Sequence, residues 1–289
     1  MKKALWIPAL LLLFFIGDRL GAWILSQLVE KSEFRYARLY KGEAAADILL
    51  LGNSRGLIFY QPYIEDLTGQ STFNLSYNSL PMDVGKILVE DYLERYPAPK
   101  KLIVDVTMCD RINNQLITGF SPFRKYSPAL NNLIKEVSIK SWWAGNISHL
   151  YRYNGEVFQR TLNYIGKTDK DWLIDRVISS NMLASAASES VVELTASDYQ
   201  LSKLTHLIEI AEQHQIEVEL LVNPYFPAYA KRMTSLHQFI AQIEETTGKK
   251  VKNYALALHK KEGFGDFQHL NKKGSKQYLA QLLKDGVLE

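Results

Sequence analysis

The sequence has one cysteine and no marked excess of charge of either sign. Cys109 is the only cysteine among 289 residues, so an intramolecular disulfide is excluded. The 34 lysines and arginines are nearly balanced by 31 aspartates and glutamates, which leaves a formal net charge of +3. Nucleic-acid-binding domains usually carry a strong basic excess on one face. DNA and RNA are therefore set aside as partners.

The sequence also lacks the usual patterns of metal and nucleotide sites. No cluster of cysteines, histidines or paired carboxylates has metal-ligand spacing, and no glycine-rich phosphate-binding loop is present. Internal repeats and low-complexity tracts are missing as well. The content of 47% hydrophobic and 22% charged residues is typical of a folded protein with one large domain. We therefore expect a globular protein without a cofactor.

Residues 1–29 are predicted to anchor the chain in a membrane. Two lysines precede an apolar run from Ala4 to Gly17, and apolar residues resume after Asp18 and Arg19. The uninterrupted run is shorter than the roughly 20 residues that cross a bilayer, so the two charged residues should lie near the outer interface or pair there. The basic start favours a cytoplasmic N-terminus. We expect a single-pass anchor in a bacterial inner (cytoplasmic) membrane with the remaining chain outside; a cleaved signal segment and a buried core helix are the alternatives.

After a polar connector at residues 30–45, short apolar runs alternate with helical patterns through residues 46–289. This alternation predicts an α/β fold, a three-layer αβα arrangement with a mostly parallel sheet covered on both faces. The expected strands are Ala46–Leu51, Thr72–Leu75, Lys101–Thr107, Ile216–Val222 and Val251–Leu256. The expected helices are Asp83–Tyr96, Tyr199–His214 and Lys272–Lys284.

A long insertion at about residues 110–195 interrupts this alternation, and we expect it to form a helical cap. Its aromatic rings could bind sugars or line an acyl pocket, although at helical spacing such rings more often fill a core. The aromatic residues are Trp142, Trp143, Tyr151, Tyr153, Phe158, Tyr164 and Trp172.

A serine motif, Gly52-Asn53-Ser54-Arg55-Gly56, follows directly where the first expected strand ends. A serine at this place can project from the carboxyl edge of the sheet, where open α/β folds collect their sites. Because a hydroxyl is a weak nucleophile, it needs a nearby base. Serine and glycine are also common turn residues, so the motif requires a histidine partner. The G-x-S-x-G spacing suits α/β-hydrolases too, but their serine follows several strand-helix units.

The best histidine partner lies near the C-terminus, in a loop before the last expected helix. There Asp266 and His269 are three residues apart, so the carboxylate can orient one imidazole nitrogen while the other faces a serine. The other histidines lie in helical or charged surroundings and are interpreted as surface or packing residues. These are His149, His206, His214, His237 and His259.

With both blocks in place, the chain resembles the SGNH/GDSL hydrolase superfamily. The segments DILLLGNSRG, TGQSTFNLSYNS and DFQHLNKKGS are similar to a bacterial, envelope-associated branch that includes O-acylation factors of exopolysaccharides and cell-wall polymers. The resemblance covers most of residues 46–285 apart from the insertion. It implies a flavodoxin-like three-layer fold with Ser54 as nucleophile, His269 as base and Asp266 as its orienting acid.

The resemblance also implies an oxyanion hole, for which the matching residues are less regular. The backbone amide of Ser54 matches one donor position, and the family's glycine donor would fall near Ser76 or Asn78, where a backbone amide is still present. The family's asparagine after the third strand is missing at the expected place, and Asn113 comes later. Asn78 could supply a side-chain amide instead, and we rank it above Asn113.

Three further residues are candidates for the cleft around the serine, together with Asn113. Asn53 replaces the family's usual aspartate before the nucleophile, Arg55 follows the nucleophile, and Asn223 ends an expected strand. Arg55 could instead form a salt bridge with a nearby carboxylate. Asn223 precedes a proline, which is also a common turn pattern.

These observations predict a membrane-anchored, extracytoplasmic serine esterase or O-acyltransferase that works through an acyl-enzyme. The expected substrate is an acylated glycan or envelope polysaccharide, and for a transferase the resemblance implies a membrane-bound acyl-donor protein as partner. One alternative is a catalytically inactive scaffold that binds polysaccharide or a membrane complex, because a fold does not guarantee activity. A lipid esterase or lysophospholipase is the second alternative.

Overall fold

The computed structural model describes the chain apart from residues 1–5, 169–171, 187 and 192. Contacts between residues divide the chain into two compact units, and each unit joins segments that are far apart in the sequence. The N-terminal unit comprises residues 1–43 and 113–169, and the sheet unit comprises residues 44–112 and 170–289.

The sheet unit is built on five parallel strands in the order β2-β1-β3-β4-β5. This is the strand order of flavodoxin-like doubly wound sheets, so the expected fold class is confirmed. All residues of β1 and β3 are buried, as expected for central strands with both faces covered. The strands are β1 (Ile48–Leu51), β2 (Thr72–Asn74), β3 (Lys101–Asp105), β4 (Glu217–Val222) and β5 (Val251–Asn253).

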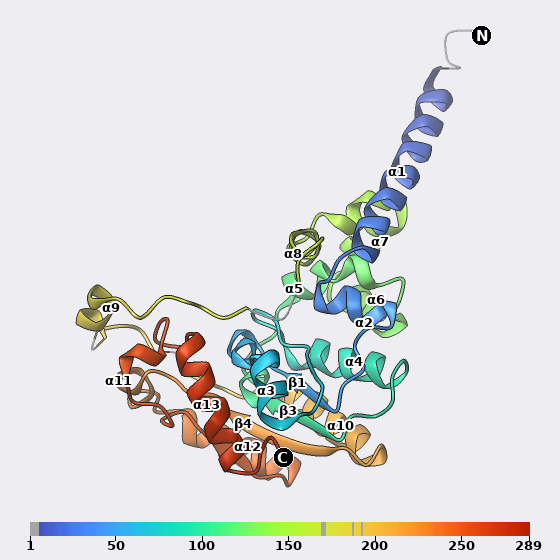
Figure 1. The fold of residues 1–289 in the computed structure, drawn as a ribbon. Coiled ribbons are helices and arrows are strands. Elements are labelled where there is room, and N and C mark those ends of the chain that lie inside the picture. The colour runs from blue at the N-terminus through green and yellow to red at the C-terminus, as the bar shows by residue number, and fades with distance from the viewer. Residues whose placement is uncertain (1–5, 169–171, 187, 192) are drawn as a thin grey trace. The chain divides into compact units, whose positions relative to one another are not determined.

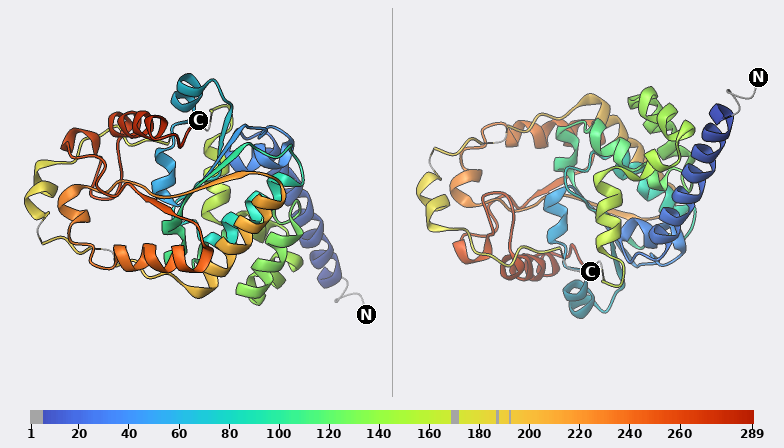
Figure 2. Two further views of the ribbon diagram at one scale, coloured as in Figure 1. Left: turned by 90° about the horizontal axis from the view of Figure 1, so that it is seen from below. Right: turned by 90° about the horizontal axis from the view of Figure 1, so that it is seen from above.

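Helices cover the sheet in two layers (Figures 1 and 2). Helices α4, α10 and α12 pack together as one layer, and α3 and α13 pack together as the other. The layer helices are α3 (Gln61–Thr68), α4 (Met82–Leu93), α10 (Asp198–Gln213), α12 (Leu236–Thr247) and α13 (Lys272–Lys284). Shorter helices in this unit are η2 (Ser54–Ile58), η3 (Val106–Asp110), α9 (Ser180–Ser185), α11 (Pro227–Ala230) and η6 (Lys261–Gly263).

The third strand ends earlier than expected because a side chain starts a new helical turn. The third strand was expected to run to Thr107, but β3 ends at Asp105, because the Asp105 carboxylate accepts the Thr107 backbone N–H at 3.0 Å and starts η3. Helix α13 has the expected bounds. Asn271 caps its start by accepting the Gly274 N–H, and Gly286 follows its end with a positive φ of 71°.

Within the residues that the structure describes, the N-terminal unit is built from helices, with one isolated β-bridge between Ser32 and Ile165. The helices are α1 (Trp6–Glu30), α2 (Arg35–Lys41), α5 (Asn114–Gly119), η4 (Ser121–Phe123), α6 (Pro128–Val137), α7 (Ile139–Ile147), η5 (Leu150–Tyr153) and α8 (Glu156–Asn163). Helix α1 is long and apolar enough to cross a membrane, with a mean hydropathy of 1.7 over 18 residues.

Most of the polar connector expected at residues 30–45 is instead a packed part of the N-terminal unit, which includes the chain up to Glu43. Tyr36 and Leu39 of α2 are fully buried, and the Tyr36 ring lies 5.0 Å from the ring of Phe120. The insertion is helical, but residues 113–169 belong to this unit while the residues that follow belong to the sheet unit. Hydrophobic periodicity could not show this division, because it does not report which distant segments pack together.

Candidate active site

The serine motif forms a tight turn at the carboxyl end of β1. Asn53 accepts the Arg55 N–H with its side chain at 3.0 Å, and this bond starts η2 at Ser54. A Cβ on Gly52 would lie 2.8 Å from the Gly56 Cα, and one on Gly56 would overlap the Ser76 hydroxyl. Both glycines are therefore required by close packing. The turn leaves Ser54 half-exposed at the edge of the sheet.

The histidine lies on a loop that folds back on itself before α13. The Asp266 Oδ1 accepts the backbone N–H groups of Gln268 and His269, each at 2.9 Å. The carbonyl of His269 accepts the Gly265 N–H at 2.9 Å, which closes the loop. The same Asp266 oxygen lies 2.9 Å from the imidazole Nδ1 of His269. Backbone and side-chain bonds thus orient the histidine together.

Two polar residues that the sequence analysis missed hold this loop against the serine turn. The Asn271 side-chain amide donates to the carbonyl of Glu262 at 2.9 Å while its oxygen caps α13. The buried Ser275 hydroxyl donates to the carbonyl of Ile58 at 2.5 Å, which ties α13 to η2. The Asn-x-x-x-Ser spacing at the start of the last helix was visible, but its partners are set by the fold.

Ser54, His269 and Asp266 come together as a hydrogen-bonded chain. The His269 Nε2 lies 2.9 Å from the Ser54 Oγ, while Nδ1 faces the Asp266 carboxylate. With the imidazole proton on Nδ1, Nε2 accepts the serine proton. The histidine and aspartate side chains are 26% and 21% exposed, so the group is open to small molecules. This geometry suits nucleophilic attack by the serine.

The aspartate of this chain is held in its ionised form. Burial raises the pKa of Asp266, but the hydrogen bond and charge of His269 and the N–H groups of Gln268 and His269 lower it more. Its pKa therefore lies below the usual value. Arg176, which the sequence analysis missed, has its Nη2 3.9 Å from the Asp266 Oδ2 and is 69% exposed.

Three of the candidate cleft residues belong to a buried polar network beneath the serine turn instead. The Asn53 amide donates to the Thr107 hydroxyl at 3.0 Å, and that hydroxyl donates to the Asp105 Oδ1 at 2.6 Å. The Asn223 amide donates to the Asp105 Oδ2 at 2.7 Å. The Arg55 Nη2 lies 3.6 Å from the same oxygen. The network joins the carboxyl ends of β1, β3 and β4, and Asp105 is its centre.

Arg55 is enclosed by protein and does not line a cleft. Its Nη2 donates to the Asn223 carbonyl at 2.7 Å, and its guanidinium lies 3.5 Å from the centre of the Tyr225 ring. Burial lowers the pKa of Arg55, and the negative charge of Asp105 opposes this shift. The expectation of a salt bridge to a nearby carboxylate describes this side chain better than a place in the cleft.

Replacing Asp105 with alanine is expected to destabilise the protein by about 3 to 5 kcal/mol, because it leaves the buried Arg55 charge without its counter-ion. Urea denaturation of the detergent-solubilised full chain measures the free energy of unfolding. The matched control is Glu212→Ala, which removes an exposed ion pair with Lys249 and should cost at most about 1 kcal/mol. Equal losses in the two variants would contradict a structural role for the network.

The expected oxyanion donors differ in their hydrogen-bond partners within the protein. The Ser76 N–H already donates to the Asn74 side-chain oxygen at 2.9 Å, which corrects the expectation that it faces the substrate. Asn113 belongs to the N-terminal unit, where its side chain accepts the Leu116 N–H and caps α5. Within the described residues, the Ser54 N–H has no protein acceptor.

Asn78 lies in a turn that is attached to the serine motif. The Tyr77 N–H donates to the Gly52 carbonyl at 3.2 Å, and the Leu80 N–H donates to the Tyr77 carbonyl at 3.1 Å. Asn78 is half-exposed, and its side chain makes no hydrogen bond in the part of the chain that the structure describes. Its amide is thus available to a ligand beside the serine turn.

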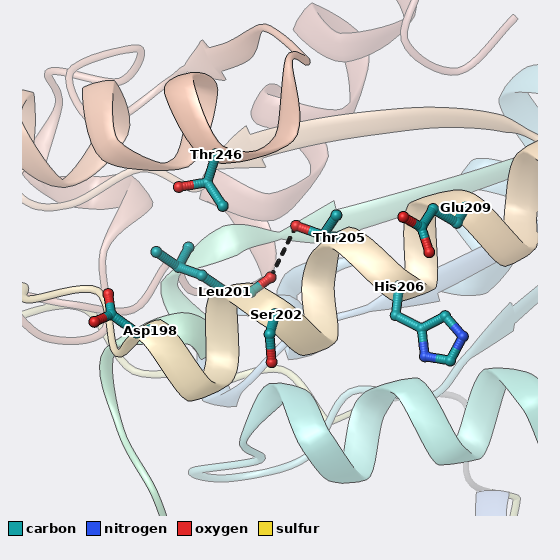
Figure 3. Close-up of a pocket in the computed structure, with 7 residues that line it drawn as sticks. All are labelled: Asp198, Leu201, Ser202, Thr205, His206, Glu209 and Thr246. Atoms are coloured by element: carbon teal, nitrogen blue, oxygen red, sulfur yellow. Dashed lines mark hydrogen bonds between the residues drawn. The ribbon is translucent and has the colours of Figure 1, made fainter.

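A surface groove along α10 does not include Ser54, His269 or Asp266 among its lining residues. The groove has a volume of about 360 Å³ and includes His206, Glu209 and Thr246, of which only Thr246 comes from α12 (Figure 3). Within the described residues, no group of three or more histidine, cysteine, aspartate or glutamate side chains could hold a metal ion.

Comparisons with known proteins give structural neighbours only. No protein-family model and no curated protein sequence matches the chain. An acylhydrolase candidate from Bacteroides fragilis shares 11% identity over 86% of this chain and 90% of its own, with a TM-score of 0.39. A platelet activating factor candidate from Streptococcus pneumoniae shares 13% identity over 97% and 98%, with a TM-score of 0.43.

A GDSL-like lipase from Bacteroides thetaiotaomicron shares 11% identity over 86% of this chain and 89% of its own, with a TM-score of 0.38. At these identities and TM-scores, the neighbours do not support a conclusion about the function of this chain. Its fold class is established by its own sheet order, and its function is inferred from the geometry at Ser54.

Proposed function

We propose that the chain is a serine esterase or O-acyltransferase of the SGNH type. The observation that supports this most strongly is the continuous chain from the Ser54 Oγ through both imidazole nitrogens of His269 to Asp266, with 2.9 Å at each step. The inactive scaffold would have been favoured by a serine beyond hydrogen-bond reach of the histidine. The observed distance favours an enzyme.

The proposed reaction has two steps that share one histidine. The Ser54 oxygen attacks the acyl carbonyl carbon as its proton moves to the His269 Nε2, and the tetrahedral intermediate collapses as the same proton passes to the leaving alcohol. The acyl-enzyme then reacts with water or a sugar hydroxyl, whose proton moves to His269 and returns to Ser54. Asp266 holds Nδ1 and stabilises the imidazolium formed in each step.

We propose that the backbone N–H of Ser54 and the side-chain amide of Asn78 donate hydrogen bonds to the negatively charged oxygen of the tetrahedral intermediate. Replacing Asn78 with alanine is then expected to lower kcat by about 10²- to 10³-fold with little change in KM, because the donor acts in the transition state. Steady-state kinetics on p-nitrophenyl acetate measures both constants. Asn132→Ala, at an exposed position of α6, serves as control. A loss confined to KM would place Asn78 in substrate binding instead.

The preferred substrate is an O-acylated envelope polysaccharide or related glycan. The resemblance to polymer O-acylation factors and the long apolar α1 support this choice. We place the chain as a single-pass protein of a bacterial inner membrane with its sheet unit outside the cytoplasm. If the acceptor is a sugar, a membrane-bound protein would supply the acyl group.

Acetate release by the detergent-solubilised full chain tests the proposal directly. We expect turnover of p-nitrophenyl acetate, and either deacetylation of an acetylated polysaccharide or acetyl transfer to its deacetylated form. A lysophospholipid, assayed for fatty-acid release, tests the lipid esterase alternative. Faster turnover of the lysophospholipid than of the acetylated glycan would overturn the glycan assignment. Inactivity of the folded protein on all substrates would overturn the esterase assignment and leave a strict transferase that needs its donor protein, or the scaffold.

A further inference from the structure

The middle of α1 is locked to the segment that joins α7 and η5. Asp18 is only 4% exposed, although it interrupts an apolar helix. Its carboxylate accepts the Ser148 hydroxyl at 2.5 Å, the His149 N–H at 2.7 Å and the Leu150 N–H at 3.1 Å. These donors lie at the start of η5. The carboxylate is therefore satisfied by protein groups and caps the beginning of this short helix.

Neighbouring residues of α1 bring the same segment into direct contact. The Arg19 Nη1 donates to the Ile147 carbonyl at 3.2 Å. A Cβ on Gly21 would lie 3.0 Å from the Leu150 side chain, so glycine allows a close approach at this point. The end of α7 and the start of η5 are thus held at the level of residues 18–21 of α1. Figure 1 shows α7 beside α1.

An exposed apolar stripe runs along α7 toward this contact. Ile139, Trp143 and Ile147 are spaced by four residues and are 48%, 55% and 70% exposed. Such spacing puts them on one face of the helix. The stripe continues with Leu150 and Tyr151 of η5, which are also exposed. We call these five residues the α7 patch.

The length of α1 places the attachment of the α7 patch just inside the far edge of the hydrocarbon core. The apolar part from Trp6 to Gly17 has 12 residues and spans about 18 Å, which is less than the roughly 30 Å of a hydrocarbon core. If α1 crosses the bilayer, about 12 Å more must come from the following residues. Leu20, Trp23 and Ile24 are exposed and apolar there. These residues begin at the level where α7 and η5 are attached.

The N-terminal unit also carries the charge expected for contact with lipid headgroups. Its sequence has 14 lysines and arginines and 7 aspartates and glutamates, whereas the sheet unit has 20 and 24. Basic segments near a membrane surface are attracted to anionic lipids. Tryptophan and tyrosine, both present in the α7 patch, are enriched at membrane interfaces.

We propose that the α7 patch inserts into the interfacial region of the bilayer beside α1. The inference rests on the proposed anchoring of the chain by α1. Its occupant is lipid, since the patch is attached at residues 18–21, within the part of α1 that completes the crossing. The N-terminal unit then contacts the membrane through both α1 and the α7 patch. Protein groups cover Asp18 where α1 crosses.

Site-specific fluorescence in vesicles tests this insertion. Full-length variants Ile147→Cys, Leu12→Cys and Asn132→Cys are labelled with an environment-sensitive fluorophore and reconstituted in phosphatidylcholine and phosphatidylglycerol. Cys109 is buried and should not react in the folded protein. Ile147 reports on the patch, Leu12 on α1, and Asn132 on an exposed polar position of α6.

We expect lipids with a spin label on the acyl chain to quench the labels at residues 147 and 12 at least about twofold more than the label at residue 132. Quenching at 12 with a water-exposed label at 147 would overturn the insertion of the patch while leaving the anchor intact. A protein partner, absent from these vesicles, would then replace lipid as the proposed occupant of the patch. A water-exposed label at 12 would overturn the anchoring and the inference together, without bearing on the esterase reaction.

Discussion

Replacing Ser54 with alanine is expected to lower kcat on p-nitrophenyl acetate by about 10⁴- to 10⁶-fold, because the variant has no oxygen to form the acyl-enzyme. His269→Ala should cause a loss of similar size, since the hydroxyl then has no base within reach. The double variant should be no worse than either single variant, because the two groups act as one unit. Burst kinetics on the wild type would report the acyl-enzyme itself.

The control for this series is Ser202→Ala, which removes an exposed hydroxyl that donates only to the carbonyl of Tyr199 in its own helix. It should leave kcat unchanged. Unfolding curves establish that each variant is folded before its kinetics are compared. Retention of more than about a hundredth of wild-type kcat by folded Ser54→Ala would exclude the serine as the nucleophile.

Replacing Asp266 with asparagine is expected to lower kcat by about 10⁴-fold while leaving the fold intact. The asparagine oxygen can still accept the N–H groups of Gln268 and His269, but it carries no charge to stabilise the imidazolium. The control is Arg176→Gln, which removes the exposed charge 3.9 Å from Asp266. Because exposed ion pairs contribute little, its kcat should change by less than about threefold. A similar loss in both variants would assign the effect to local charge instead.

The same aspartate is expected to make stability depend on acid pH. Because its folded-state pKa lies below the usual value of 3.8, its contribution to the free energy of unfolding is present above pH 3.8. This contribution is lost as pH falls through the lower folded-state value. The stability difference between wild type and Asp266→Asn should therefore shrink in acid. Urea denaturation at a series of pH values measures this difference, and a pH-independent difference would contradict the assignment.

The sequence predicted the elements whose signals are local. Buried strands showed as short apolar runs, and the last helix was predicted at Lys272–Lys284, which are the bounds of α13. Ser54 follows a strand directly, and Asp266 lies three residues before His269, so both blocks could be recognised without a fold. Their meeting required the parallel order of the sheet, which the alternation of strands and helices already predicted.

Other residues could not be placed because their environment comes from distant segments. Whether the Ser76 N–H can bind a ligand depends on the side chain of Asn74, whose oxygen accepts this N–H. Arg55 was expected near the cleft because it follows the nucleophile, and Asn223 because it ends an expected strand. They are buried because Asp105, at the end of the neighbouring β3, supplies a carboxylate between them.

The sequence by itself determined the α/β class and the two blocks that carry Ser54, Asp266 and His269, because periodicity and short spacings are properties of neighbouring residues. Only the tertiary structure decided which polar side chains face solvent, which ones brace the serine turn, and how residues 31–43 and 113–169 join α1 in one unit. Burial and hydrogen-bond partners depend on segments that meet in space, and a linear pattern does not contain that information.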